Sequence, residues 1–395
     1  MRPRRAAAPC VLAAAVTLAA ACGSSTNPPV LGGPLGGGSD AGDGSSSLIS
    51  DAGPVIQNCG VGPDGGVCAC ADEPLVVDPP TLYFVLDRSG SMNDMGKWST
   101  VRTVIARLTI ALGDRARFAA AVFPDPVQEL CTPGGQVFPT LHGQALAPVQ
   151  GDGAFGSAGP IDLDFAWSLG HIGASGGTPT AVTLQGLLPL VKGFGGKTYV
   201  VLATDGGPNC DPSATCTAAM CTLNIEAVSP CTPTGADCCG AAGPGGPLDC
   251  LDAQPSIDAV AAFAAAGIPV YVIGIPGSEA YGSLLDQLAM AGGTARGSEP
   301  QYFAVSTYDQ SALYAAMSKI AAKVAGSCTL TLDKTPPVPT QVNVFLDGTA
   351  IPQPGTNGWT LAGKTVTILG TSCQAILDGS VIDVRVVAGC PTKIH

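Results

Sequence analysis

Continuously apolar runs alternate, through the middle of the chain, with segments whose apolar residues have helical spacing. Such runs are typical of strands that are buried on both faces of a parallel sheet. They occupy residues 81–86, 117–123, 197–204, 269–275 and 302–305. Apolar residues with helical spacing follow in residues 97–112, 180–191, 256–266, 281–290 and 308–324. The pattern predicts an α/β domain over residues 78–325, with a doubly wound, mainly parallel sheet and helices on both faces.

Two further segments have other patterns. Residues Ile161 to Leu169 alternate apolar and polar positions, which predicts a strand with one buried face. From Gly326 the helical periodicity stops. Short β runs follow, separated by Asp347-Gly348, Asn357-Gly358 and Asp378-Gly379. This spacing predicts a small all-β module over residues 326–395.

The N-terminus has the pattern of an export signal. Basic residues precede an apolar, alanine-rich run that ends at Ala21, too short for a comfortable membrane span. Small residues followed by Cys22 resemble a bacterial lipobox, although Ala19 stands where Leu is usual. The resemblance implies a signal peptide at residues 1–21 and a lipid anchor on Cys22. Cleavage without lipidation, with Cys22 as a free thiol, is the alternative.

Residues 22–77 comprise the anchor cysteine, a flexible Gly/Ser/Pro linker and a cysteine-containing collar at 59–77. The acidic residues of the linker do not follow a calcium-loop pattern, so we interpret it as a solvated tether. We therefore expect an exported lipoprotein of the cell envelope, with outer-membrane, periplasmic and surface-facing locations left open.

Charge and cysteine content narrow the possible partners. The formal net charge is −12, which disfavours nucleic acid as a partner because phosphate binding needs a basic face. Of the 16 cysteines, an even number remains once Cys10 and Cys22 are set aside. They fall into four groups of odd size, so complete pairing requires disulfides between groups. A zinc site is disfavoured, since the chain has 3 histidines and no paired CxxC motifs.

Candidate chemistry lies at the ends of the predicted strands. Asp87, Ser89 and Ser91 follow the first strand, Thr178 lies in a glycine-rich loop, and Asp205 follows a later buried strand. Ligands bind at the carboxyl ends of strands in open α/β sheets, and these ends meet if the strands are neighbours. Carboxylate and hydroxyl oxygens suit a hard cation such as Mg²⁺.

These residues resemble the metal-ion-dependent adhesion site of von Willebrand factor type A domains. Asp87-Arg88-Ser89-Gly90-Ser91 matches the family's DxSxS motif, Thr178 its loop threonine, and Asp205 its later aspartate. The resemblance implies that these residues hold a divalent cation, Mg²⁺ first and Mn²⁺ or Ca²⁺ as alternatives. It also implies a partner protein or acidic ligand that supplies a carboxylate to the ion. The cysteine-rich insertion at about 206–255 departs from the family pattern, and we expect it to influence partner choice.

Several neighbouring residues leave alternatives open. Thr180 could replace Thr178 as a ligand. Asp94 is expected to be a solvated loop acid rather than a second-layer residue, and Arg88 a surface residue. Gly173 to Gly177 match the GxSxG motif of hydrolases around Ser175, but the only later histidine is His395. We therefore expect no enzyme activity.

The sequence favours a divalent-metal-dependent protein-binding or adhesion module on the bacterial envelope. The alternative is a structural envelope assembly protein, stabilised by disulfides, that binds no ligand through a metal.

Overall fold

The computed structural model describes residues 55–56, 70–73, 75, 79–128, 130–138, 169–215 and 246–393. The predicted signal peptide, Cys22 and nearly all of the predicted linker lie outside these residues. So do residues 216–245 of the insertion and most of the strand predicted from Ile161 to Leu169, although Leu169 itself is helical. None of the helices in the described ranges is long and apolar enough to cross a membrane.

A six-stranded sheet forms the centre of the larger domain, in the order β5-β4-β3-β6-β7-β8. Its strands are β3 (Thr81–Asp87), β4 (Arg117–Phe123), β5 (Gly135–Phe138), β6 (Thr198–Thr204), β7 (Val270–Gly274) and β8 (Phe303–Ala304). Neighbouring strands are parallel except β4 and β5, which are antiparallel. The mainly parallel sheet is confirmed, and β5 is an edge strand that the sequence pattern did not predict.

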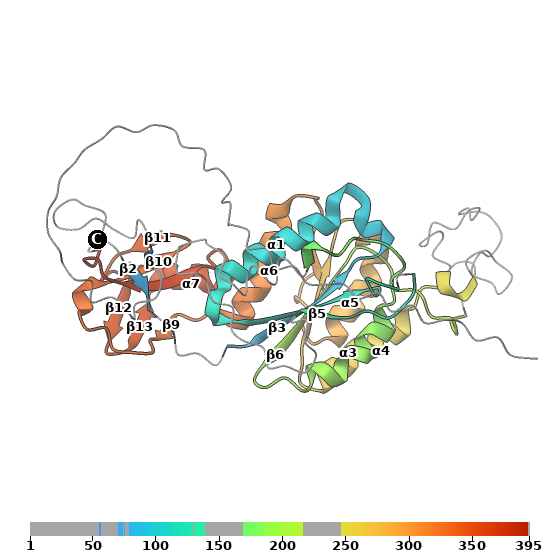
Figure 1. Cartoon of the computed structure of the whole chain (residues 1–395), viewed down its shortest axis with the longest axis horizontal. Coiled ribbons are helices and arrows are strands. Elements are labelled where there is room, and N and C mark those ends of the chain that lie inside the picture. Colours follow the sequence, from blue (N-terminus) through green and yellow to red (C-terminus); the bar gives the residue numbers. More distant parts are fainter. Residues whose placement is uncertain are drawn as a thin grey trace, which may run out of the picture. The chain divides into compact units, whose positions relative to one another are not determined.

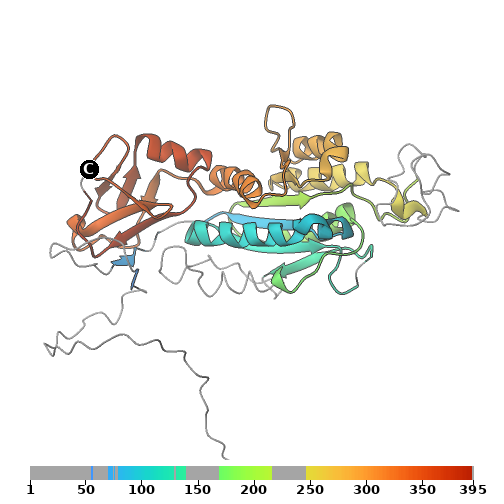
Figure 2. The same cartoon turned by 90° about the horizontal axis from the view of Figure 1, so that it is seen from above.

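Helices cover both faces of this sheet, as predicted (Figures 1 and 2). They are α1 (Lys97–Leu112), α3 (Thr180–Val191), α4 (Ala253–Ala265), α5 (Gly282–Ala291) and α6 (Gln310–Ala325). Residues of α1 and α6 share one apolar core, and residues of α3, α4 and α5 share the other. Helix α4 begins at Ala253 rather than at Ser256, which is buried inside the helix.

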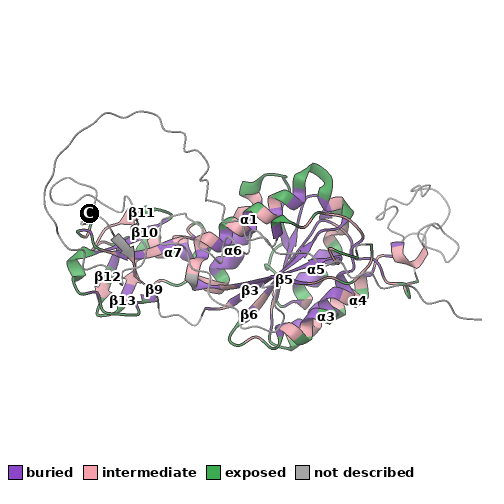
Figure 3. Ribbon diagram, in the orientation of Figure 1, coloured by how far each residue is buried: buried purple, intermediate pink, exposed green. Residues whose placement is uncertain are grey.

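Strand β3 divides its side chains between the two cores. Leu82, Phe84 and Leu86 belong to the core beneath α1 and α6, whereas Tyr83 and Val85 belong to the opposite core. All of β3 is buried, and Figure 3 shows the central strands in the colour of buried residues. Burial on both faces explains why the sequence of β3 is continuously apolar and does not alternate.

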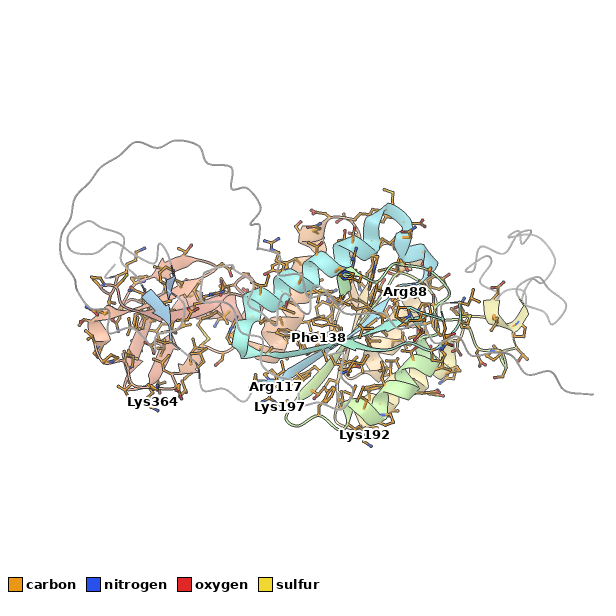
Figure 4. The ribbon with its side chains drawn as sticks, in the orientation of Figure 1. Arg88, Arg117, Phe138, Lys192, Lys197 and Lys364 are labelled. Carbon is orange, nitrogen blue, oxygen red and sulfur yellow. A yellow bond between two sulfur atoms is a disulfide. The ribbon has the colours of Figure 1, made fainter. Side chains whose placement is uncertain are left out.

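The strand order fixes where the candidate site lies. Strand β3 pairs with β4 on one side and with β6 on the other. The chain therefore adds strands first on one side of β3 and then on the other, which makes the position beside β3 a topological switch point. Arg88 follows the end of β3, while Arg117 and Lys197 lie at the opposite edge, where β4 and β6 begin (Figure 4). The carboxyl ends of β3 and β6 therefore meet at the switch point where ligands bind in open α/β sheets.

The C-terminal module contains two antiparallel sheets, in the orders β1-β2-β14-β10-β11 and β12-β13-β9. Its elements are β1 (Val55–Ile56), β2 (Cys70–Asp72), β9 (Thr329–Thr331), β10 (Val342–Leu346), β11 (Thr349–Ile351), β12 (Trp359–Ala362), β13 (Thr365–Ile368), α7 (Gly370–Asp378) and β14 (Val384–Ala388). The β runs predicted at 329–332, 341–346, 365–369 and 381–387 correspond to β9, β10, β13 and β14. Strands β11 and β12 were not predicted, and the helix α7 shows that the module is not all-β. Strand β2, from the predicted collar, pairs with β14 and so joins the module.

Candidate metal centre

Asp87 lies at the end of β3 and has no exposed surface. Its Oδ1 accepts a hydrogen bond from the Ser89 backbone N–H at 2.8 Å, and its Oδ2 accepts one from Thr204 Oγ1 at 2.5 Å. Thr204 ends β6, so this second bond joins the two central strands at their carboxyl ends. The carboxylate is thereby fixed in orientation directly behind the turn that carries the two serines.

Ser89, Ser91 and Asp205 form a connected row of oxygens in front of Asp87. Ser89 Oγ lies 3.2 Å from Ser91 Oγ, and Ser91 Oγ donates to Asp205 Oδ1 at 2.8 Å. Ser89 and Asp205 are buried, and Ser91 is half-buried at the start of a short 3-10 turn, Gly90–Gly96. Sequence neighbours and a residue from a distant segment therefore meet, as expected for neighbouring strands, since β3 pairs with β6.

Thr178 completes the set from the glycine-rich loop that precedes α3. A Cβ built on Gly206 would lie 3.7 Å from Thr178 Oγ1 and 3.9 Å from Ser91 Oγ, so both hydroxyls flank the same glycine. Asn209 holds the Thr178 backbone from both sides. Its Oδ1 accepts from Thr178 N at 2.7 Å, and its own N–H donates to Thr178 O at 3.0 Å.

The structure shows where the neighbouring residues Thr180, Asp94 and Ser175 lie. Thr180 begins α3, and its hydroxyl donates to the Thr178 carbonyl at 3.4 Å rather than joining the row of oxygens. Asp94 is exposed on the 3-10 turn, as expected for a solvated acid. Ser175, the central residue of the GxSxG motif, accepts a hydrogen bond from Arg88 Nη2 at 2.9 Å.

The prediction that Arg88 is a surface residue was wrong, because the side chain is only 1% exposed. Its guanidinium donates to the carbonyls of Gly173, Pro124 and Asp125 and to the Ser175 hydroxyl. The planar fork of arginine can satisfy several acceptors at once, which makes this buried position tolerable. Arg88 thereby ties the loop after β4 and the Thr178 loop to the DxSxS turn.

Backbone contacts bring the Thr178 loop close to this turn. Gly90 N donates to Gly176 O at 2.8 Å, and Gly177 N donates to Leu130 O at 2.8 Å. Gly176 has a φ of 87°, and a Cβ there would lie 2.8 Å from Leu130 O. Only glycine fits this conformation and this space, which explains the glycine at position 176.

Electrostatics single out Asp87. Burial, and next the charge of Asp205, raise the pKa of Asp87 from 3.8 to about 7, while hydrogen bonds from Ser89 and Thr204 oppose the rise. The charged form of this carboxyl therefore lacks sufficient positive charge around it. Burial and the charge of Asp205 also raise the pKa of Tyr281.

Lys97 is a residue of the site that the sequence interpretation missed. Its Nζ lies 2.5 Å from Asp205 Oδ2, and both side chains are buried. Lys97 is the first residue of α1, where the helix dipole disfavours a positive charge. An unfavourable lysine at the start of α1, directly after the 3-10 turn, was therefore a signal in the sequence for a nearby acidic partner.

A disulfide fixes two of the loops at this edge. Cys131 is bonded to Cys210, which connects the loop after β4 to the beginning of the insertion. This bond links two of the odd-sized cysteine groups, as complete pairing required. Cys328 is bonded to Cys373 within the C-terminal module, and Cys250 and Cys390 are disulfide-bonded as well.

The side chains present fit a hard divalent cation. Ser89, Ser91, Thr178, Asp87 and Asp205 contribute only oxygens, the donors that Mg²⁺, Mn²⁺ and Ca²⁺ prefer. Burial disfavours the ionised form of Asp87 and so raises its pKa, and a cation bound beside the carboxylate would favour that form. Nowhere in the described residues do three or more His, Cys, Asp or Glu side chains form a group that could hold a metal ion. Ion binding here would therefore depend on the hydroxyls.

A mainly parallel sheet between two helical layers, with the DxSxS turn at its switch point, gives the chain a von Willebrand factor type A-like fold. No known protein-family model matches the sequence. No curated protein matches it either.

Solved structures with similarity to the chain include bacterial surface proteins. The pilus adhesin SpaC from Lactobacillus rhamnosus GG is 14% identical over 83% of this chain and 41% of SpaC, with a TM-score of 0.43. A von Willebrand factor type A protein from Catenulispora acidiphila is 14% identical, covering 88% of this chain and 68% of that one, with a TM-score of 0.40. The vWF domain of the type V pili tip protein Mfa5 from Porphyromonas gingivalis is 14% identical, covering 62% of this chain and 94% of that one, with a TM-score of 0.39. The chain thus spans less than half the length of SpaC.

Proposed function

We propose that this chain is a binding protein of the bacterial cell envelope that uses a divalent cation to accept a carboxylate from a partner. The convergence of Asp87, Ser89, Ser91, Thr178 and Asp205 at the switch point carries the proposal. Mg²⁺ is the first candidate, with Mn²⁺ or Ca²⁺ as alternatives. The partner is a protein or another acidic ligand.

The side chains of the site have separate roles in this proposal. Ser89, Ser91 and Thr178 provide neutral hydroxyls, so they bind without cancelling the charge of an ion. Asp87 and Asp205 provide the negative charge, directly or through water. A cation with few charged ligands keeps much of its positive field and can accept one more carboxylate, from an Asp or Glu of the partner.

Arg88 and Asn209 are positioning residues in this scheme. Arg88 ties the Thr178 loop to the DxSxS turn, and Asn209 holds the Thr178 backbone. Because Asn209 and Cys210 open the insertion, the segment that fixes Thr178 continues into the segment that we expect to contact a partner. Deletion of residues 216–245 should therefore alter partner choice while metal affinity is retained.

Display on the envelope rests on the N-terminal sequence. A lipid on Cys22 would attach the chain to the membrane through the Gly/Ser/Pro linker, and the disulfides suit an oxidising compartment. Replacing Cys22 with Ala should move the protein from the membrane fraction of the expressing bacterium to the soluble fraction. Unchanged membrane association would contradict a lipid anchor at this residue.

A second candidate is a structural envelope assembly protein that needs no ion. The observation in its favour is Lys97, which already pairs with Asp205 inside the site. In that case the row of oxygens and the Cys131–Cys210 bond would stabilise the edge of the sheet, and association with other envelope proteins would not depend on metal.

One experiment separates the two candidates. Wild type, Asp87→Ala and Asp94→Ala would be titrated with Mg²⁺ and Mn²⁺ by calorimetry, then immobilised and exposed to envelope extract with and without EDTA. Asp94 is the matched control because it is an aspartate on the 3-10 turn that follows the DxSxS motif, but its side chain is exposed. The proposal predicts metal binding and EDTA-sensitive capture for wild type and Asp94→Ala, and the loss of both in Asp87→Ala. Equal, EDTA-insensitive capture by all three would favour the structural candidate.

A further inference from the structure

Lys97 is a buried cation inside the candidate site that the proposed function does not use. The residue is 7% exposed, and its Nζ contacts Asp205 Oδ2 at 2.5 Å. The other carboxylate oxygen, Oδ1, accepts the hydrogen bond from Ser91. Asp205 therefore presents one oxygen to the hydroxyl row and keeps the other on the ammonium group.

The surroundings of Lys97 hold it in this position. Gly277 lies against the ammonium group, since a Cβ built on Gly277 would be 3.1 Å from Lys97 Nζ and 3.4 Å from Asp205 O. Gly277 also has a φ of 112°, a backbone conformation that residues with a side chain rarely adopt. The first turn of α1 contains no acidic residue that could attract Lys97 elsewhere. The lysine is therefore enclosed between Asp205 and the Gly277 backbone rather than extended into solvent.

We propose that Lys97 sets the charge of the site, so that it weakens the binding of the divalent cation and strengthens the binding of a carboxylate to the loaded site. This inference rests on the proposed function. It adds a specificity-determining residue to the five that the sequence predicted.

The charges of the buried side chains give the direction of both effects. Ionised Asp87 and Asp205 together with Lys97 leave one net negative charge, whereas without Lys97 there would be two. A divalent cation is attracted more strongly by two negative charges than by one. Once loaded, however, the site with Lys97 carries one net positive charge, and the site without it is neutral. The same ammonium group therefore opposes the cation and attracts the incoming carboxylate.

The test uses Lys97→Met, which keeps a long unbranched side chain, one atom shorter than lysine, and removes its charge. Mn²⁺ is the probe for the cation, measured by calorimetry. Acetate is the probe for the carboxylate, titrated into the Mn²⁺-loaded protein and followed by water-proton relaxation. Relative to wild type, we expect Lys97→Met to bind Mn²⁺ at least about tenfold more tightly and acetate at least about tenfold more weakly. Lys192→Met is the control, because Lys192 is exposed directly after α3 and lines a separate pocket with Phe194 and Pro269.

Opposite changes in the two affinities are a result that a merely structural role for Lys97 would not produce. If wild type binds Mn²⁺ and Lys97→Met changes neither affinity, the inference is wrong and the proposed function stands. If only Lys97→Met binds Mn²⁺, the proposed function is wrong for the native chain, but the opposition between Lys97 and the ion is supported. If neither protein binds Mn²⁺, both are wrong.

The folding of the variant provides a further readout. Without metal, Lys97→Met leaves the charge of Asp205 uncompensated, so its melting temperature should fall below that of wild type. Saturating Mn²⁺ should raise it more than it raises that of wild type, since the ion replaces the lost positive charge. A variant that stays unfolded in saturating Mn²⁺ would contradict the inference.

Discussion

The carboxyl edge of the large sheet and the C-terminal module bury different kinds of side chain. At the sheet edge, Asp87, Arg88, Lys97 and Asp205 are all buried. In the module, the described core consists of aliphatic residues around Trp359, and Asn343 is the buried polar side chain. Both regions contain a disulfide. Buried charges cost stability unless they are well paired, whereas buried apolar side chains contribute it. The difference agrees with the proposed function, in which the edge binds an ion and the module contributes stability.

The largest expected effect on stability comes from the module. Trp359 is completely buried, and its indole N–H donates to Ile351 O at 3.2 Å. Trp359→Ala should lower the free energy of unfolding by about 3–5 kcal/mol, because it leaves a cavity and an unpaired carbonyl. Urea denaturation would measure the loss. Mn²⁺ affinity of the folded variant should equal that of wild type, and a weaker affinity would show that the two regions are coupled.

A pair of neighbouring threonines sharpens the comparison at the sheet edge. Thr178→Val keeps the shape of the side chain and removes the hydroxyl that flanks Gly206, so Mn²⁺ affinity should fall at least about tenfold. Thr180→Val removes a hydroxyl that only contacts the Thr178 carbonyl, and it should change affinity little. Calorimetry on both variants gives the ratio. A larger loss for Thr180→Val would assign the ligand role to Thr180.

Removing each of the two disulfides in turn gives a matched comparison, with a smaller expected effect on Mn²⁺ affinity. Leu130, next to Cys131, accepts from Gly177 N, and Asn209, next to Cys210, holds Thr178. Removing both cysteines, Cys131→Ser with Cys210→Ser, should loosen the Thr178 loop and weaken Mn²⁺ binding about three- to tenfold. Removing Cys328 and Cys373 in the same way should lower the stability of the module and leave Mn²⁺ affinity unchanged. The reverse pattern would contradict a clamping role for the Cys131–Cys210 bond.

A further expected effect is a dependence on pH. The pKa of Asp87 is about 7 in the folded, metal-free protein, above its ordinary value of 3.8. Folding therefore favours proton uptake, so the metal-free protein should gain stability as pH falls from about 8 to about 5. Asp252, whose pKa burial raises to about 6, contributes in the same direction. Mn²⁺ affinity should change in the opposite sense, because a proton on Asp87 competes with the ion.

Asp87→Asn isolates the contribution of Asp87 to these pH effects. In this variant the slope of melting temperature against pH, measured in EDTA, should be shallower than in wild type. An unchanged slope would show that Asp87 is ionised over the whole range.

Much of the large domain could be predicted because its strands and helices have strong periodicity. Helix α1 and strand β4 have the predicted bounds, and β3, α3 and β6 differ from them by no more than one residue. Strand β5 was missed because it is short and lies in a segment rich in Gly and Pro. Helix α7 was missed because it buries a single apolar residue, Ile376, and so lacks a clear stripe. The pairing of β2 with β14 joins residues from opposite ends of the chain, which local patterns cannot predict.

The site divides in the same way. Its five predicted residues belong to recognisable motifs, and the strand order brings them together. Lys97 and Asn209 were missed because their roles arise from contacts with residues far away in the sequence, 108 positions for Lys97 and Asp205. Arg88 was misjudged because a charged residue in a turn is ordinarily exposed. Its burial follows from carbonyls of two other loops, which only the folded chain assembles.

The most direct test of the central claim is anomalous diffraction from crystals soaked in Mn²⁺. We expect a single strong anomalous peak at the carboxyl edge of the sheet, bounded by Ser89 Oγ, Ser91 Oγ and Thr178 Oγ1, and no peak there in Asp87→Ala. A map without a peak at this position, from crystals in which Mn²⁺ is bound elsewhere on the protein, would contradict the account.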